Sequence, residues 1–455
     1  MSFPLVCMAP VGYGGFKGSM RRGKLMKRLF VNAHILTMRE KDTLLEHAYL
    51  VTEDNCITEV GQGDPPVVYD EILDMKGKLL LPGFINTHGH AAMTLLRGYA
   101  DDLPLKTWLE EKMWPIEGRF GPEQVRWGTA LAMVEMIRGG TTCFADMYDH
   151  MDQVGALVAD AGMRASLCRG VIGLGSQTER EAKRREAVQF AQQWHREANG
   201  RITTMMAPHA PYTCPPAYIE SIVSDAERLH LPIHIHLSET RREVEQNVQD
   251  YGKRPVAHLD QLGVFHRPAL VAHAVHVTED EIQLLAERGV KVSHNPGSNL
   301  KLASGIAPVL AMLKKGIRPS LGTDGAASNN NLDLLEEIRL AALIHKGVGE
   351  DPEAIPAETA LAMGTRFGAE ALFLEEEIGT LEPGKKADFV TMDISRAHWQ
   401  PTHDLLSHVV YSASAADVQD VYVDGRPLMR NRELLTLDEE RIRWETIRAF
   451  EKVSP

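Results

Sequence analysis

Hydrophobic and polar positions follow two different rhythms along the chain. Residues 29–83 hold short apolar runs separated by turn residues, which is typical of β-strands. From about residue 84, an apolar run, a polar turn and an amphipathic segment follow one another repeatedly. This second rhythm predicts parallel strands joined by crossover helices.

About eight strand-and-helix units can be placed in this second region, which is the number that closes a barrel. The expected strands are residues 83–90, 141–147, 164–170, 202–209, 232–239, 270–276, 290–296 and 318–324. Helical segments such as 123–138, 216–229 and 278–288 lie between them. The stripe Trp127, Leu131 and Val134 has helical spacing and is interpreted as core. We therefore predict an α/β protein with a (β/α)8 TIM barrel over residues 84–373.

The first rhythm returns near the end of the chain. Turn-rich residues 378–384 lead into a strand-like run at 387–392, and another run follows at 418–423. We expect residues 29–83 and 374–455 to form one smaller, composite β-sandwich domain, with a helix over 436–453. Residues 1–28 precede the first strand-like run, and we interpret them as a disordered extension or the result of an over-long start-site assignment.

Composition narrows the range of partners. The chain has 49 Lys and Arg against 62 Asp and Glu, a net charge of −13 with neutral histidines. Nucleic acid and anionic membranes would repel such a chain, so a small-molecule substrate is favoured. Five scattered cysteines without CxxC spacing indicate neither a disulfide framework nor a thiolate zinc cluster, which favours the cytoplasm. No apolar run reaches the length of a membrane span, and a homo-oligomer is compatible with the sequence.

Several expected strands end in unusual polar residues. In a parallel barrel the carboxyl ends of the strands meet at the active site, so residues far apart in the sequence converge there. The residues concerned are His88 and His90 at the end of the first expected strand, His234, His236 and Glu239 at the fifth, His273 and His276 at the sixth, and Asp324 at the eighth. Three imidazoles and one carboxylate, with water in an open position, would suit a divalent metal used in hydrolysis.

A single buried histidine is more often a core residue than a ligand, and His258, His276 and His294 are interpreted in that way. A carboxylate lies among histidines at the ends of expected strands one, five and eight. Burying a carboxylate without a compensating charge is costly, so this grouping favours a metal site over core packing. His234 and His236 face the same way, so both remain candidates. Glu239, three residues past His236, favours His236.

The chain resembles the amidohydrolase superfamily, and within it the 5-methylthioadenosine/S-adenosylhomocysteine deaminases. The matching motifs are residues 82–90, 108–117, 207–212, 236–240 and 321–325. The resemblance covers nearly all of the chain after the N-terminal extension. It implies a (β/α)8 barrel with a flanking β-sandwich, and metal ligands at His88, His90, His236 and Asp324.

The resemblance also implies roles for individual residues. Asp324 is expected to act as ligand and base, Glu239 to protonate a ring nitrogen, and His273 to orient water or stabilise the developing oxyanion. The expected substrate contacts are Glu117, Arg169, His209, Glu239, Asp324 and Trp108. Glu117 would accept the ribose hydroxyls, although a solvated acid at a helix start is the plainer interpretation. Arg169 would meet the sugar or an amino-acid carboxylate, or serve only as a structural ion-pair partner.

Many members of the superfamily hold a second metal bridged by a carboxylated lysine at the end of strand four. No lysine occurs between Lys183 and Lys253, so strand four has none to offer. We therefore predict one divalent ion. Zinc suits these nitrogen and oxygen ligands, and iron, manganese or nickel could occupy the same set.

The predicted function is hydrolytic deamination of adenosine-type nucleosides to the inosine analogue and ammonia. The expected substrates are S-adenosylhomocysteine, 5′-methylthioadenosine, adenosine and 5′-deoxyadenosine. One alternative keeps the scaffold but acts on another N-heterocycle, as guanine-type deaminases and triazine hydrolases do. A further alternative, a binding protein on an inactive barrel, would require a broken ligand set, and the set is intact in the sequence.

Overall fold

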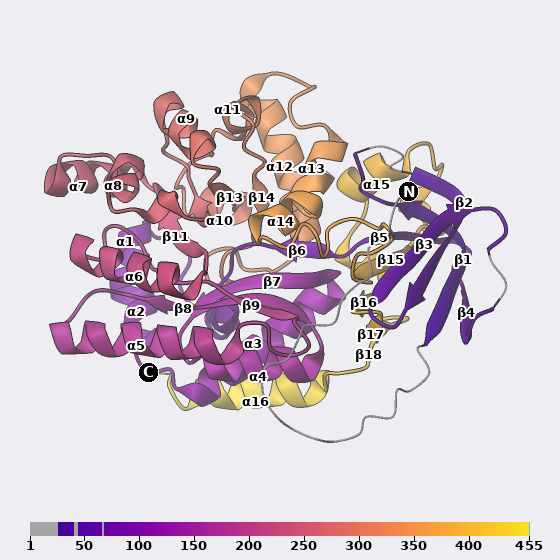
Figure 1. Ribbon diagram of the computed structural model, residues 1–455, viewed down its shortest axis with the longest axis horizontal. Coiled ribbons are helices and arrows are strands. Elements are labelled where there is room, and N and C mark those ends of the chain that lie inside the picture. Colours follow the sequence, from indigo (N-terminus) through magenta and orange to yellow (C-terminus); the bar gives the residue numbers. More distant parts are fainter. Residues whose placement is uncertain (1–25, 41–43, 66–67, 455) are drawn as a thin grey trace.

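The computed structural model describes residues 26–40, 44–65 and 68–454 of the chain (Figure 1). Strands lie at the centre, helices surround them, and a further sheet lies at one end. The expectation for residues 1–28 falls mostly outside the described residues, and the first strand begins at Lys27. Within the described ranges, no helix is both long and apolar enough to cross a membrane.

The central strands form two parallel sheets that hydrogen bonds join into a ring. They are β6 (Phe84–Asn86), β7 (Thr141–Tyr148), β8 (Arg164–Val171), β9 (Ile202–Thr204), β10 (Ala207–Pro208), β11 (Ile233–Leu237), β12 (Ala269–His273), β13 (Lys291–His294) and β14 (Ser320–Leu321). One sheet has the order β10-β8-β7-β6, with β9 beside β8, and the other β11-β12-β13-β14. A bridge from Met206 to Ile233 joins the sheets on one side, and Thr87 N–H donates to the Leu321 carbonyl oxygen on the other. This curled parallel sheet is of the TIM-barrel type.

Several central strands are shorter than the expected apolar runs. The first and last expected strands, 83–90 and 318–324, leave the ladder several residues early, and 202–209 is divided into β9 and β10. Residues at or just beyond the carboxyl ends of strands leave strand geometry. His273 and Asp324 adopt φ angles of 74° and 58°, which non-glycine residues rarely do and which concentrate at functional sites.

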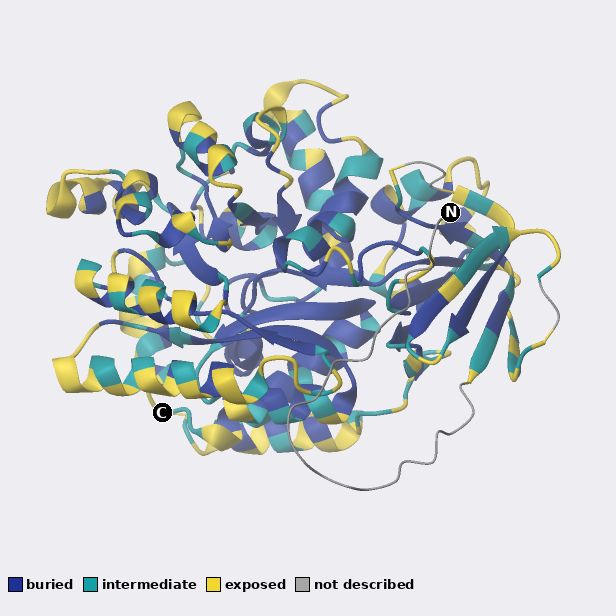
Figure 2. Ribbon diagram, viewed as in Figure 1, coloured by how far each residue is buried: buried dark blue, intermediate teal, exposed yellow. Residues whose placement is uncertain are grey.

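Helices cover the ring and expose mainly their outer faces (Figure 2). The principal helices are α3 (Pro122–Arg138), α4 (Met151–Ala161), α5 (Gln177–Trp194), α6 (Pro216–Leu229), α7 (Arg241–Tyr251), α8 (Pro255–Gln261), α9 (Glu279–Glu287), α10 (Pro296–Lys301), α11 (Val309–Lys314), α12 (Leu334–Gly349), α13 (Ala357–Met363), α14 (Arg366–Ala371), α15 (Leu405–Tyr411) and α16 (Glu439–Glu451). Shorter helical pieces are α1 (Leu105–Thr107), α2 (Trp114–Glu117), a π-helical turn at Trp108–Met113, and 3₁₀ turns at Ala91–Leu96, Val264–His266, Ala397–Trp399 and Ala415–Asp417. Val134 on α3 is buried in the main apolar core, and Trp127 and Leu131 are partly buried and pack against it, in agreement with the predicted core stripe.

Strands from both chain ends share the remaining sheet. Its members are β1 (Lys27–Leu36), β2 (Leu44–Glu53), β3 (Cys56–Gln62), β4 (Glu71–Asp74), β5 (Lys78–Pro82), β15 (Phe389–Asp393), β16 (Val418–Val423), β17 (Arg426–Arg430) and β18 (Glu433–Leu434). The order is β18-β17-β16-β15-β5-β1-β2-β3, with β4 beside β1. The antiparallel pair β5 and β15 therefore joins the two ends of the chain.

The last helix, α16, lies away from this sheet and against α3 (Figure 1). Gln124 donates its side-chain amide to the Ala449 carbonyl oxygen at 3.0 Å, and the Thr446 hydroxyl donates to the Trp127 carbonyl oxygen at 3.1 Å. The C-terminal segment thus covers a barrel helix after contributing strands to the sheet.

Candidate active site

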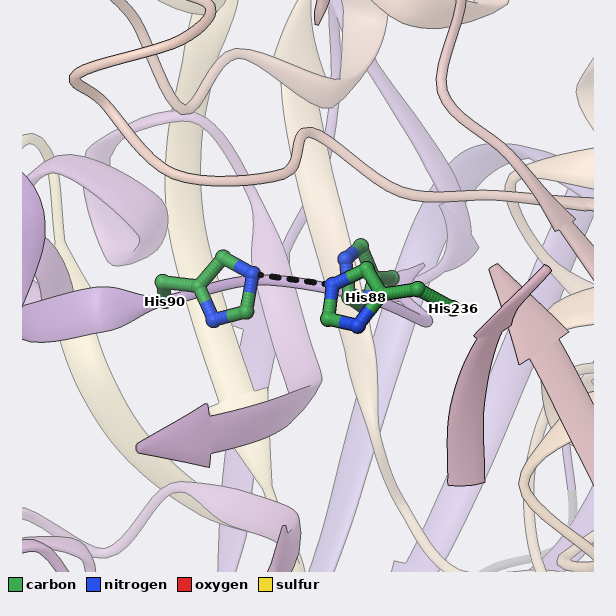
Figure 3. Close-up of side chains that lie close together, drawn as sticks. All are labelled: His88, His90 and His236. Atoms are coloured by element: carbon green, nitrogen blue, oxygen red, sulfur yellow. Dashed lines mark hydrogen bonds between the residues drawn. The ribbon is translucent and has the colours of Figure 1, made fainter. Parts of the chain in front are cut away.

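Three histidines and one aspartate meet at the carboxyl ends of the central strands. His88 and His90 follow β6, His236 lies on β11, and Asp324 follows β14. The Nε2 atoms of His88 and His90 lie 3.4 and 3.3 Å from Asp324 Oδ1. His236 Nε2 lies 3.4 Å from His90 Nε2, and Figure 3 shows these three rings together. Nitrogen and oxygen atoms at such spacings form a cage that could hold a cation.

The outer nitrogen of each ring is already bonded. His90 Nδ1 lies 2.7 Å from the Met147 carbonyl oxygen, and His236 Nδ1 lies 2.7 Å from the His209 carbonyl oxygen. An N–H that donates to a carbonyl leaves the lone pair on Nε2, which faces the cage. His88 Nε2 is buried and has no hydrogen-bond partner among the described residues. These features fit a divalent metal ion, which needs unprotonated imidazole nitrogens.

Asp324 is held so that one oxygen faces the cage. The hydroxyls of Ser298 and Ser328 donate to Oδ2 at 2.7 and 2.9 Å, while Oδ1 faces the histidines. Burial alone would raise the pKa of Asp324, but the neighbouring rings of His88 and His90 outweigh it and hold the pKa well below the usual value. The carboxylate is therefore an anion with one fixed and one available oxygen.

Glu239 and His273 face one another beside the cage. His273 Nε2 lies 3.8 Å from Glu239 Oε2, and the Ser304 hydroxyl donates to Glu239 Oε1 at 3.2 Å. Burial raises the pKa of Glu239, which favours a protonated carboxyl. The Asn299 amide lies 2.9 Å from His273 Nδ1, and because its N–H donates, the ring proton of neutral His273 is on Nε2 and faces the cage.

A cavity of about 410 Å³ opens over these groups. Every predicted site residue lines it except His88, which is fully buried: the lining includes His90, Trp108, Glu117, Arg169, His209, His236, Glu239, His273 and Asp324. The barrel thus brings together residues that are up to 234 positions apart in the sequence. A site that encloses a small molecule has this size and mixed lining.

Glu117 lies in the cavity wall and is bonded to Tyr148. The Tyr148 hydroxyl donates to Glu117 Oε1 at 2.5 Å. Burial raises the pKa of Glu117, and this hydrogen bond opposes the increase. Glu117 is the last residue of the four-residue helix α2, and its side chain is partly buried.

Arg169, His209 and Trp108 line the cavity in different ways. Arg169 Nη2 lies 3.0 Å from Asp149 and 3.2 Å from Glu186, so its charge is already paired. Burial, together with nearby imidazoles, lowers the pKa of His209 to about 3, which keeps the ring neutral. The buried Trp108 donates its indole N–H to the Ala100 carbonyl oxygen at 3.0 Å and serves largely as packing.

The model of the amidohydrolase family matches residues 79–428. The chain belongs to the amidohydrolase family. A 5-methylthioadenosine/S-adenosylhomocysteine deaminase of Halalkalibacterium halodurans is 51% identical over 434 residues, which are 94% of this chain and 99% of that protein. The similarity to this deaminase therefore extends over almost the whole length of both proteins.

Solved amidohydrolase-like structures agree with this placement. The crystal structure of an adenosine deaminase from Xanthomonas campestris with bound zinc has a TM-score of 0.89 and 38% identity, covering 94% of this chain and 98% of the other. The atrazine chlorohydrolase of Arthrobacter aurescens TC1 complexed with zinc has a TM-score of 0.87 and 25% identity, covering 93% and 100%. Both support a TIM-barrel type fold with a divalent metal.

This amidohydrolase also holds site residues that sequence reasoning missed. Each of them hydrogen-bonds a predicted site residue: Tyr148 bonds Glu117, Ser298 and Ser328 bond Asp324, Asn299 bonds His273, and Ser304 bonds Glu239. Most follow an expected strand within a few residues, as Ser298 and Asn299 follow 290–296, and that position was the available signal. His258 bonds Asn247 and His276 bonds the Ser304 carbonyl oxygen, consistent with the structural interpretation of these histidines.

Proposed function

We propose that this amidohydrolase deaminates adenosine-type nucleosides by hydrolysis, with S-adenosylhomocysteine and 5′-methylthioadenosine as its main substrates. The observation that carries the proposal is one cavity that contains the histidine and aspartate cage, the protonatable Glu239, and the carboxylate of Glu117 in its wall. The deaminase names of the relatives support the same reaction.

The residues proposed to hold the metal are His88, His90, His236 and Asp324. The zinc in the two solved relatives supports zinc as the ion. Such an ion would supply Lewis acidity, which makes water acidic enough to act as a nucleophile at neutral pH. The absence of lysine between Lys183 and Lys253 supports a single ion.

The proton transfers are assigned to three side chains. Asp324 Oδ1 takes a proton from the attacking water as its oxygen adds to the ring carbon that carries the amino group. The Glu239 carboxyl gives its proton to the adjacent ring nitrogen, and the proton from Asp324 then reaches the amine, which leaves as ammonia when its bond to the ring carbon breaks. The remaining hydroxyl proton returns to Glu239 as the ring carbon becomes a carbonyl, which restores all three side chains. His273 Nε2–H orients the water or the oxygen that it becomes. The lowered pKa of Asp324 and the raised pKa of Glu239 agree with this order.

The nucleoside contacts are assigned to the rest of the cavity wall. Glu117 would accept the two ribose hydroxyls, with Tyr148 holding its other oxygen in place. Neutral His209 would hydrogen-bond the purine or the sugar, and Trp108 would pack beside the substrate. Arg169 is proposed to shape the wall together with its paired acids, Asp149 and Glu186.

The ribose role of Glu117 predicts the effect of replacing Tyr148 by phenylalanine. Hydrogen bonds to charged groups contribute about 1.5–3 kcal/mol, so kcat/KM for adenosine should fall roughly 10- to 100-fold. Deamination of 2′,3′-dideoxyadenosine, which lacks both hydroxyls, should change far less. Tyr411→Phe, at a tyrosine on the outer helix α15, is the matched control. An equal loss for both nucleosides would remove the ribose role.

A substrate panel tests the function itself. The metal-loaded enzyme is incubated with S-adenosylhomocysteine, 5′-methylthioadenosine, adenosine, guanine and atrazine, and ammonia release and loss of the parent compound are followed. We expect ammonia from the adenosine compounds. Turnover of guanine or atrazine alone would instead support the alternative on the same scaffold, which the atrazine chlorohydrolase structure brings into consideration.

We propose the domain division and the compartment as follows. Residues 29–83 and 374–455 would form a β-sandwich domain beside a catalytic barrel of residues 84–373. A separate apolar cluster at the end sheet, which includes Phe30, Leu50 and Phe389, supports this division. Among the described residues, Cys143, Cys168 and Cys214 are buried free thiols, which supports a reducing cytoplasm.

A further inference from the structure

We propose that His234 is a positioning residue that orients the ring of His88 toward the metal, and that Cys168 orients His234 in turn. The inference rests on the proposed metal site of His88, His90, His236 and Asp324. It explains why β11 carries two histidines that face the barrel interior, His234 and His236. It concerns binding of the ion and needs no assumption about the substrate.

His234 is in direct contact with His88. Its Nε2 atom lies 3.1 Å from His88 Nδ1, the ring centroids are 5.1 Å apart, and the planes meet at 75°. Both side chains are completely buried. On its other side, His234 Nδ1 lies 3.8 Å from the sulfur of Cys168 on β8.

The proton positions along this contact form one consistent chain. If His88 Nε2 keeps its lone pair for a cation, the ring proton is on Nδ1 and is donated to His234 Nε2. The proton of His234 is then on Nδ1 and faces the Cys168 sulfur. The Cys168 thiol donates to the Asp146 carbonyl oxygen at 3.3 Å. Every donor in this chain has an acceptor, and the free lone pair lies at the cage end.

His88 differs from the other two histidines of the cage in its outer partner. His90 and His236 each have a main-chain carbonyl oxygen, of Met147 and His209, as outer partner. A side-chain substitution does not remove a carbonyl. The outer partner of His88 is the side chain of His234, so His88 is the one histidine of the three whose outer partner a point mutation can remove.

A purely structural role for His234 makes a different prediction. Buried histidines with hydrogen-bonded partners are common in cores, and removing one lowers stability without regard to metal. Partners of metal-bound histidines instead change metal affinity, typically by about 10- to 100-fold. The two roles are separated by measuring zinc affinity and the stability of the metal-free protein in the same variants.

The test compares His234→Gln with His234→Asn. The carbonyl of Gln can reach the place of Nε2 and accept from His88, whereas the shorter Asn side chain matches only the place of Nδ1. Zinc dissociation constants are measured by competition with a chelator, and thermal unfolding is followed without metal. We expect zinc affinity to fall about 10- to 100-fold in the Asn variant and to recover largely in the Gln variant. Cobalt-loaded Asn protein should also show altered visible absorption.

His258→Asn is the matched control, because His258 is buried and bonded to one side chain, Asn247, outside the cage. It should lower stability without changing zinc affinity. Wild-type zinc affinity in a folded His234→Asn protein, or equal loss in the Gln and Asn variants, would overturn the inference. A wild-type enzyme that binds zinc but deaminates no adenosine compound would refute the proposed function and leave this inference standing.

Discussion

Replacing Glu239 by glutamine is expected to lower kcat for S-adenosylhomocysteine by about 10²- to 10⁴-fold, the range for loss of a general acid or base. Gln has nearly the same shape, and its amide oxygen can still accept from the Ser304 hydroxyl. It cannot supply the proton that the ring nitrogen needs. Metal content and the melting temperature should change little, because Glu239 is not part of the proposed ligand set.

The measurements for Glu239→Gln are steady-state kinetics, zinc stoichiometry and thermal unfolding. Glu245→Gln on the exposed face of α7 is the control, since it makes the same chemical change outside the cavity. KM is informative too, because an interaction formed only in the transition state lowers kcat and kcat/KM together. A Glu239→Gln enzyme with near wild-type kcat would assign the proton transfer to another group.

Replacing Asp324 by alanine is expected to abolish turnover and to weaken metal binding together. Asp324 contributes the anionic oxygen that lies 3.3 Å from His90 Nε2 and is also the proposed base. Loss of a base alone costs up to about 10⁴-fold in rate, and loss of the ion adds to it. The variant also leaves the hydroxyls of Ser298 and Ser328 without the acceptor that they share.

Two measurements separate the roles of Asp324. Zinc stoichiometry after dialysis reports the ligand, and kcat at saturating zinc reports the base. Asp280→Ala, an exposed acid at the start of α9, should leave both unchanged. If Asp324→Ala keeps one zinc ion per chain after dialysis, Asp324 is not a necessary ligand. If the variant retains substantial turnover, Asp324 is not the base.

Sequence patterns predicted the parts of this molecule that depend on local rules. The alternation expected along a strand put His88 and His90 on one side, and their rings do meet at the cage, although both residues follow β6 and do not lie on it. The repeated strand and helix pattern brings Glu239 and Asp324 to the same end of the barrel. Both follow from short-range geometry and from the rule that parallel strands of a barrel share one active end.

Other features depend on contacts between distant segments, which a single sequence does not display. The choice between His234 and His236 as metal ligand is one example. Both side chains are buried, but only His236 approaches His90, whereas His234 hydrogen-bonds the Nδ1 atom of His88, on the side away from the cage. Arg169 is another, because its partner Glu186 lies on the next helix. The left-handed backbone of Asp324 also had no local signal, since Asp adopts it only where surrounding contacts require it.

The pairing of β5 with β15 has a consequence for how the molecule is made on the ribosome. β5 leads within two residues into β6 and the first histidines, yet its five-residue antiparallel partner is encoded some three hundred positions later. Until that partner has been synthesised, β5 has an unpaired edge that could join other chains. Completion of the fold must therefore wait for nearly the whole polypeptide, and nascent chains stopped before Phe389 would be prone to aggregate.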